Sequence, residues 1–449
     1  MLDIMIVLGC VSQCLDATTL RRLTRITEAM LSMTGRVTML GISRWTGPGG
    51  SYRTVQRFFG SRLNWCGLQW ALIRCHLLDH DDVILVGGDD VMTTKSGKTT
   101  YGLDRFFSSI YSKMLPGLCF LCLSLISVKR RTSYPVMMEQ HHDGLTNKSA
   151  ERPKPTSTKN KSSKKKPAKK RGRPKGSRNQ NRRAVELSPY LLFVQDTLKR
   201  LVKLIGHKIK AIYFVFDGAF GHNNAVQMVR QTGLHLISKL RHDSALYFRY
   251  EGPNSGRGKP RKYGKKLNYE DIPETYLKDC SIEKDIETKI YQMTLWHKKF
   301  ADLLNIVVIV KTNLTTQKVG HVVLFSSDLE LSYDLLIDYY QLRFQIEFNF
   351  RDAKQHWGLE DFMVVNETPV YNSANLAMFM VNVSQALMHP MRRDWPELSV
   401  NDLKTWFRSR KYVIETLKLL PEMPEPIFIE QTISKVAQLG RINHRVDPI

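Results

Sequence analysis

Four polar side chains in the last third of the chain have types and spacing that suit phosphate chemistry. Tyr340, Arg343, Glu347 and Lys354 follow one another at intervals of three, four and seven residues. In an α-helix, which turns by about 100° per residue, all four fall within an arc of roughly 60°. A carboxylate among cationic groups on one helical face suits a place where a metal ion and phosphates meet. The simpler alternative is an amphipathic helix in which Arg343 and Glu347 form an i,i+4 ion pair.

The remaining residues of this predicted helix, 339–354, divide into packing and solvent-facing sets. The flanks expected to pack carry Leu335, Leu342 and Ile346 on one side and Phe344 and Phe348 on the other. The far side, expected to meet water, carries Gln341, Gln345 and Asn349.

The spacing Tyr-x2-Arg-x3-Glu-x6-Lys resembles the YREK signature of the DDE transposases of bacterial insertion sequences, the IS-four and related groups. The match is complete at all four positions. The resemblance implies that Glu347 is the third catalytic carboxylate of the family's metal site. It also implies that Tyr340, Arg343 and Lys354 bind DNA phosphates near the scissile bond.

The first catalytic aspartate of that family follows an apolar strand and precedes a threonine. Residues 83–86 are predicted to form a buried strand, and Asp89 and Asp90 follow it after two glycines. The resemblance implies that Asp90 is the catalytic residue and metal ligand. Because Val91 replaces the usual threonine, Asp89 is the alternative first ligand.

The second catalytic aspartate is expected at the end of another apolar strand. Residues 209–216 are predicted to form such a strand, and Asp217 follows directly. The context resembles the family's second catalytic segment and implies that Asp217 is catalytic and binds metal. The alternative is an ordinary Asp-Gly turn after a strand.

A ribonuclease H-like α/β fold, a mixed sheet flanked by helices, is what the resemblance implies, and it would bring Asp90, Asp217 and Glu347 together. Three carboxylates suit two Mg²⁺ ions per active site, with Mn²⁺ able to substitute. One ion would activate the attacking water or 3′-hydroxyl, and the other would stabilise the leaving 3′-oxygen. The expected activity is metal-dependent strand cleavage at transposon ends, by a DNA endonuclease, and strand transfer into target DNA: cut-and-paste DNA transposition.

Composition points to a polyanionic partner. The 449 residues carry a formal net charge of +25, which favours nucleic acid or an anionic membrane surface. No apolar run reaches the roughly 18 residues that span a bilayer, so we expect no membrane association. The expected partners are double-stranded DNA, as transposon ends and target, and a second copy of the chain in a synaptic complex.

The seven cysteines are odd in number and scattered, which suggests free thiols in a reducing compartment. The expected location is the cytoplasm, in association with the nucleoid. Cys119 and Cys122 have the spacing of a zinc-binding pair, but no second pair or nearby histidine completes a site in the sequence. We therefore expect both to pack in the core.

The first 75 residues are predicted to be helical and to bind DNA. Helical patterns at about 36–45 and 52–63 flank a glycine-rich turn, as in a helix-turn-helix whose second helix enters the major groove. That second helix would present Arg53, Arg57 and Arg62 to DNA. The alternative is a plain helical hairpin with a solvated basic face.

A basic linker is predicted over residues 141–184. Between Lys148 and Arg183 there are sixteen lysines or arginines and one acid, so the segment cannot form a core and is expected to be disordered in isolation. Within it, Arg171, Arg173 and Lys175 belong to a Gly-Arg-Pro sequence that looks like an AT-hook, which binds a narrow A·T-rich minor groove. The alternative is a polybasic linker that contacts phosphates only.

The predicted organisation interrupts the catalytic domain twice. Its parts are expected at residues 76–140, 185–240 and 329–390, with a β-rich insertion at 241–328 and a helical carboxyl-terminal region at 391–449. Trp296, within the insertion, could stack on a flipped base, although packing is the simpler role. The alternatives to a transposase are a catalytically inactive, transposase-derived sequence-specific DNA-binding protein, and a structure-selective nuclease or resolvase of the same fold.

Overall fold

A mixed β-sheet forms the centre of the computed structural model, which describes residues 4–108, 112–141, 181–253, 256, 260–392 and 395–443. Its middle strands stand in the order β4-β3-β1-β5-β6. Their bounds are Ile84–Thr94 for β1, Lys113–Ser127 for β3, Thr132–His141 for β4, Tyr213–Val215 for β5 and His235–Leu240 for β6. β3 is antiparallel to β1 and β4, whereas β1, β5 and β6 are mutually parallel. This arrangement is consistent with the expected ribonuclease H-like fold.

An apolar run that contains Cys119 and Cys122 forms the middle of β3. Residues 118–126 are buried on both faces of the sheet, as expected for a strand with neighbours on each side and helices above and below. The short strand β2, Asp104–Ser108, pairs with the first part of β3.

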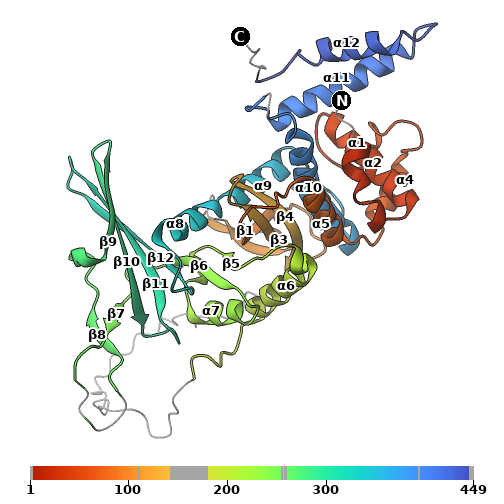
Figure 1. The fold of residues 1–449 in the computed structure, drawn as a ribbon. Helices are drawn as coiled ribbons and strands as arrows, with labels where there is room; N and C mark the ends of the chain where they lie inside the picture. Colours follow the sequence, from red (N-terminus) through yellow and green to blue (C-terminus); the bar gives the residue numbers. More distant parts are fainter. Residues whose placement is uncertain are drawn as a thin grey trace, which may run out of the picture.

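Helices cover both faces of the sheet (Figure 1). One face carries α6, Pro189–Ile205, and α7, Asn223–Arg230; the other carries α8, Tyr333–Leu342, and α9, Gln345–Gln355. α6 begins at Pro189, because the Ser188 side chain accepts a hydrogen bond from the Leu191 N–H and Pro189 occupies the first helical turn.

Residues 241–328, predicted to be a β-rich insertion, carry strands that extend the central sheet. Its strands are β7 (Leu246–Arg249), β8 (Tyr263–Lys266), β9 (Leu277–Glu283), β10 (Ile286–His297), β11 (Leu304–Asn313) and β12 (Val319–Ser326). β12 pairs with β6 and β11 pairs with β12, so the insertion continues the same sheet beyond β6. Figure 1 shows the β9–β12 ribbon projecting away from the helical end of the molecule.

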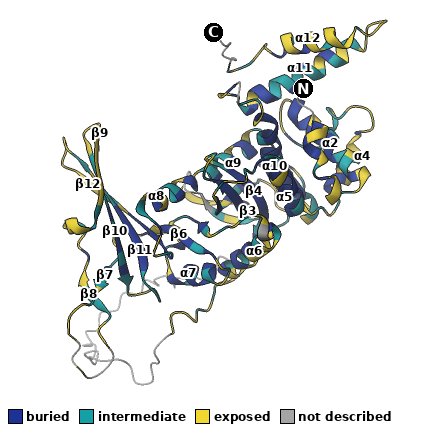
Figure 2. Cartoon of the chain, viewed as in Figure 1, coloured by how far each residue is buried: buried dark blue, intermediate teal, exposed yellow. Residues whose placement is uncertain are grey.

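The amino-terminal and carboxyl-terminal helices pack together at the opposite end. They are α1 (Ile4–Gly9), α2 (Ala17–Ser32), α3 (Met39–Ser43), α4 (Tyr52–Phe59), α5 (Trp65–His76), α10 (Glu367–Met388), α11 (Val400–Leu417) and α12 (Pro426–Val436). Short 3₁₀ turns occupy Ser12–Cys14, Gly206–Lys208, Gly218–Phe220 and Glu274–Tyr276. Figure 2 shows α10 almost wholly buried and α12 largely exposed.

One buried asparagine joins the amino-terminal helices to the rest of the protein. Asn372 of α10 accepts a hydrogen bond from the Trp65 indole N–H at 2.8 Å. Its amide donates to the carbonyl oxygens of Phe59 and Ser61, both at 2.7 Å. Because these contacts are buried, the amino-terminal helices share a core with the rest of the protein. None of the described helices is both long and apolar enough to cross a lipid bilayer.

Candidate active site

The register between β1 and β5 determines which aspartate of the Asp89–Asp90 pair lies beside Asp217. Gly87 pairs with Val215 in the parallel ladder. Continuing that register by two residues places Asp89 next to Asp217, and both side chains then lie on the face of the sheet that Gly87 occupies. Asp217 follows β5 directly, and its carboxylate accepts a hydrogen bond from the Ala219 N–H at 2.9 Å.

Helix α9 covers this face at close range. A Cβ added at Gly87 would lie 2.8 Å from Ile346 Cδ1 and 2.5 Å from Ile126 Cδ1, so a larger residue would have to displace these two side chains. Ile346 immediately precedes Glu347 and is fully buried. Glycine at position 87 therefore leaves room for the Ile346 side chain of α9 against β1.

Arg343 connects the first and third of these carboxylates. Its Nη1 donates to Asp89 Oδ2 at 2.7 Å, and its Nη2 donates to Glu347 Oε1 at 3.2 Å. The side chain of Arg343 is 15% exposed, that of Asp89 21% and that of Glu347 43%. The i,i+4 pair expected from the sequence is thus present, and a contact to Asp89, 254 residues earlier in the chain, accompanies it.

The predicted single helix over 339–354 is wrong: α8 ends at Leu342 and α9 begins at Gln345. At the junction the Phe344 N–H donates to the Gln341 carbonyl at 3.0 Å, an i→i−3 bond of the 3₁₀ type. Each residue of a 3₁₀ turn rotates further about the helix axis than a residue of an α-helix does. The side chains of α9 are therefore rotated about the axis relative to where one continuous α-helix would place them.

This rotation changes which side chains are buried. Asn349 was expected to meet water, but it is 4% exposed and its amide donates to Ser133 Oγ at 2.9 Å. Phe344 was expected to pack, but it is 50% exposed and lies edge-on to Phe348, with ring centroids 5.3 Å apart. An aromatic side chain is therefore accessible on the helix that carries Glu347.

Burial dominates the electrostatics at Asp89. Removal from water raises its pKa to about 6, and the neighbouring Asp217 and Asp90 carboxylates act in the same direction. Arg343 and the Asp90 backbone N–H oppose that rise. Removing this carboxylate from water is costly without a compensating positive charge, and Arg343 supplies that charge in this structure.

The other two residues of the four-residue signature lie around the same face. Tyr340 is half-buried, and burial raises the pKa of its phenol. The Lys354 ammonium donates to the Met92 carbonyl at 3.0 Å and lies 2.8 Å from a Glu360 carboxylate oxygen. In this structure Lys354 therefore holds the end of β1.

Asp90 points to the opposite face of β1. Its Oδ2 accepts a hydrogen bond from the Tyr190 hydroxyl of α6 at 2.6 Å, and its Oδ1 lies 3.7 Å from His141 Nε2. The structure thus brings Asp89, Asp217 and Glu347 to one face and places Asp90, the residue first expected to bind metal, on the other. Residues next to each other in a strand point to opposite faces, so only one of the pair can join Asp217.

Three carboxylates gathered on one face suit hard divalent cations, because Mg²⁺ and Mn²⁺ prefer oxygen ligands. Asp89, Asp217 and Glu347 supply only oxygen donors. The buried position of Asp89 gives a second reason for a cation there, because a positive charge would compensate the desolvated carboxylate. The residues present therefore fit a divalent metal site.

The residues predicted to contact DNA elsewhere lie in different places. Arg53, Arg57 and Arg62 are exposed on and just after α4, whose Val55, Phe58 and Phe59 are buried. Arg171, Arg173 and Lys175 lie outside the described residues.

Trp296, at the end of β10, is partly buried and pairs with Tyr247 of β7. The Lys262 ammonium lies 3.3 Å from the centre of the Trp296 ring system. A cation therefore occupies one face of this tryptophan.

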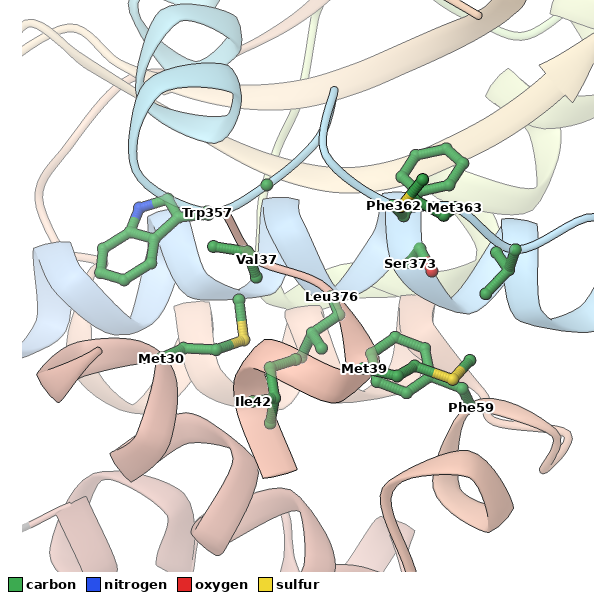
Figure 3. Close-up of a pocket in the computed structure, with 12 residues that line it drawn as sticks. Met30, Val37, Met39, Ile42, Phe59, Trp357, Phe362, Met363, Ser373 and Leu376 are labelled. Atoms are coloured by element: carbon green, nitrogen blue, oxygen red, sulfur yellow. The ribbon is translucent and has the colours of Figure 1, made fainter. Parts of the chain in front are cut away.

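A small apolar pocket lies away from the carboxylates, between the amino-terminal helices and the segment after α9 (Figure 3). Met30, Val37 and Ile42 line it from one side. Trp357 and Leu376 line it from the other. Its lining is predominantly apolar, so it belongs to the interface between these parts and not to the catalytic chemistry.

Comparison with known proteins identifies a family for this chain. A search of curated proteins gave no match. The family described as "DDE superfamily endonuclease" matches residues 10–301, which include Asp89, Asp90 and Asp217. Glu347 lies beyond the matched residues, and its place in the site comes from its contact with Arg343. Membership of this family indicates metal-dependent cleavage of DNA. The match covers more than half of the chain, and the protein therefore belongs to the DDE superfamily endonucleases.

Proposed function

We propose that this protein is a DNA transposase, of the IS-four-like group with the YREK signature, that cleaves the ends of its element and joins them to target DNA. The observation that carries the proposal is the Arg343 bridge between Asp89 and Glu347, on the face that also carries Asp217. Three carboxylates and a guanidinium near one another support binding of a scissile phosphate at this face. The family match supports DNA as the substrate.

Asp89, Asp217 and Glu347 are the proposed metal ligands, with Asp89 in place of Asp90. Two Mg²⁺ ions, or Mn²⁺ in their place, would supply activation of the attacking oxygen and stabilisation of the leaving oxygen when bound. The carboxylates hold the negative charge that attracts these ions. Gly87 contributes by leaving room for the Ile346 side chain of α9 against β1.

Arg343 and Tyr340 are the proposed phosphate-binding residues. A guanidinium with two donors directed at two carboxylates has further N–H groups for a phosphate oxygen. With cations bound by the carboxylates, Arg343 would not be needed to compensate their charge and would be available to bind a substrate phosphate. Lys354 uses contacts to Met92 and Glu360 in this structure, and the third donor of its ammonium can reach a phosphate.

The DNA duplex would be held by more than the catalytic face. The exposed Arg53, Arg57 and Arg62 are proposed to bind a transposon end through α4. The basic linker with Arg171 and Arg173 would add minor-groove or phosphate contacts. Two ends must be cut for one transposition, so we propose a homodimer in a synaptic complex, acting at the nucleoid.

The test is strand cleavage by the Glu347→Gln variant on DNA cloned from the two flanks of the gene. The substitution removes one charge with little change in shape, so folding and DNA binding should persist while Mg²⁺-dependent cleavage is lost. Glu330→Gln, an exposed glutamate just before α8, is the matched control and should cleave normally. Cleavage at the unmutated rate by Glu347→Gln would overturn the assignment. Tight, specific binding without cleavage by the unmutated protein would favour a transposase-derived DNA-binding protein.

A further inference from the structure

Asp90, Cys119 and His141 form a second cluster on the face of the sheet opposite Asp89. Each offers a ligand atom, and these atoms all lie within 4.8 Å of one another. The residues come from three neighbouring strands: Asp90 from β1, Cys119 from β3 and His141 from β4. Cys119 and His141 are direct partners in the β3–β4 ladder.

His141 is the residue that most requires an explanation. It is 2% exposed, and within the described part of the chain no group hydrogen-bonds to either of its ring nitrogens. The 3.7 Å separation between its Nε2 and Asp90 Oδ1 is too long for a hydrogen bond. Burying an imidazole without partners for its nitrogens costs free energy.

The surroundings of this histidine make the cost larger. The ring centroids of Phe106, Tyr190 and Phe193 lie 6.1, 5.6 and 5.9 Å from that of His141, and all three rings are oriented edge-on to it. Among these neighbours of His141, the polar groups are the Asp90 carboxylate and the Cys119 thiol. A buried imidazole that points toward a thiol and a carboxylate is the arrangement of a metal ligand set.

We propose that Asp90, Cys119 and His141 bind one zinc-like divalent cation, separate from the catalytic ions. Zinc binds thiolate, imidazole and carboxylate groups, whereas Mg²⁺ prefers a set made of oxygen alone. The Tyr190 hydroxyl holds Asp90 Oδ2 at 2.6 Å and leaves Oδ1, the oxygen nearer His141, for the cation. On binding, the Cys119 thiol loses its proton to solvent.

The cation would have a structural role immediately behind the active site. It would join β1, β3 and β4 through side chains and fix β1 in its register against β3. Asp89 is the next residue to Asp90 and faces the other way, so a cross-link at Asp90 would also hold Asp89 in place. This inference does not depend on transposition, because it concerns a different face of β1 and a different donor set.

The experiment measures metal bound to the full chain, purified without a histidine tag. Elemental analysis should find about one zinc ion per chain. Replacement by Co²⁺ should produce the thiolate-to-cobalt absorption band that only a cysteine ligand gives. Cys119→Ala should lose the band, whereas Cys122→Ala should keep it, although both cysteines are buried in the same strand.

Two further variants separate metal binding from folding and from catalysis. His141→Phe places an apolar ring among the aromatic side chains, so it should fold but bind less than about one-tenth of the unmutated zinc content. A strong chelator should lower the Tm of the unmutated protein and leave that of His141→Phe unchanged. Glu347→Gln should keep the cobalt band, because the catalytic carboxylates are not involved.

Absence of zinc from the unmutated protein, with no cobalt band after reconstitution, would overturn the proposal. Persistence of the band in Cys119→Ala would also overturn it, since the thiol would then lie elsewhere, for example at Cys10 or Cys75. Loss of the band in Cys119→Ala and His141→Phe, with retention in Cys122→Ala and Glu347→Gln, would support it.

Discussion

Arg343 Nη1 lies 2.7 Å from Asp89 Oδ2, and this contact joins two segments that are 254 residues apart in the chain. The same guanidinium contacts Glu347 one helical turn later. Because Arg343 and Asp89 are mostly buried, with 15% and 21% of their side chains exposed, Arg343 compensates negative charge that divalent cations would compensate in the working enzyme.

Replacement of Arg343 should therefore affect catalysis and metal affinity in opposite directions. Arg343→Ala should slow strand cleavage at least about tenfold, which corresponds to ~1.4 kcal/mol of transition-state stabilisation. Without DNA, the same variant should bind Mg²⁺ or Mn²⁺ severalfold more tightly, because the carboxylates lose a competing cation. Calorimetric titration beside a cleavage assay measures both quantities.

Arg343→Lys is the control for charge. It should leave metal affinity near the unmutated value, while cleavage is intermediate because an ammonium cannot reproduce the two-donor fork. A large fall in Tm with a proportionate loss of activity in Arg343→Ala would instead make Arg343 a structural residue.

The hydrogen bonds of Asn372 should contribute strongly to the stability with which the amino-terminal helices are held against the rest of the protein. Asn372→Ala leaves the Trp65 indole N–H and the Phe59 and Ser61 carbonyl groups without their partner. Because these groups are buried, the free energy of unfolding should fall by about 3 kcal/mol. Urea unfolding measures this change, and Asn366→Ala is the control, since the exposed Asn366 makes no capping hydrogen bond on the same helix. An equal effect of the two substitutions would refute the structural role.

Because of Lys404, the free energy of unfolding should depend on pH in the alkaline range. Burial lowers its pKa from the ordinary value of 10.5 to about 8, with Arg408 acting in the same direction. The unfolded chain therefore binds more protons than the folded protein between pH 8 and 10.5, so the cost of the buried charge is complete below pH 8 and is relieved as the pH rises. Lys404→Met removes this cost but also the contact of Lys404 with the His356 carbonyl at 3.2 Å.

The measurement for Lys404 is the difference in Tm between Lys404→Met and the unmutated protein. It should decrease steadily, by a few degrees at most, as the pH rises from 8 to 10.5. A difference that is constant or grows over this range would show that Lys404 is not held charged at a cost.

The basic linker should determine how DNA affinity depends on salt. Sixteen cations between Lys148 and Arg183 should release many counterions, so deletion of residues 148–183 should weaken binding and flatten the slope against salt concentration. Replacing Arg171 and Arg173 by alanine should reduce the preference for A·T-rich duplex. The control pair, Lys159→Ala with Lys161→Ala, removes the same charge outside the Gly-Arg-Pro sequence. Equal A·T preference in the two double variants would exclude an AT-hook.

Local sequence signals predicted much of the fold because they act over a few residues. Ser51 and Ser188 cap α4 and α6, as serine commonly does at a helix start, and the apolar runs before Asp89 and Asp217 form β1 and β5 as predicted. The i,i+4 contact between Arg343 and Glu347 was also predictable, since it lies within one helical segment.

The face on which each aspartate points could not be predicted, because β1 is buried on both faces. Leu85 and Val86 are both fully buried, so alternation of apolar and polar residues, the usual sign of a strand's inner face, is absent. The β1–β5 register and the approach of α9 distinguish Asp89 from Asp90, and both are tertiary features.

The relation between Cys119 and His141 was missed for a similar reason. No histidine stands near the cysteine in sequence, and the β3–β4 hairpin brings the two together across neighbouring strands. Cys122, three residues along the same strand, points to the other face, so the apparent zinc-binding pair is divided between two faces. The signal that could have found the site is the pairing register of two long apolar strands.

The most direct test compares the neighbouring aspartates in one assay of Mg²⁺-dependent strand cleavage. Asp89→Asn should reduce cleavage at least about a hundredfold, because it removes a proposed ligand of the catalytic ions. Asp90 faces α6 instead, so Asp90→Asn should reduce cleavage by less than about tenfold. The two variants remove the same charge at adjacent positions, so their difference reports which face performs the chemistry. Loss of cleavage in Asp90→Asn with retention in Asp89→Asn would contradict the site formed by Asp89, Asp217 and Glu347.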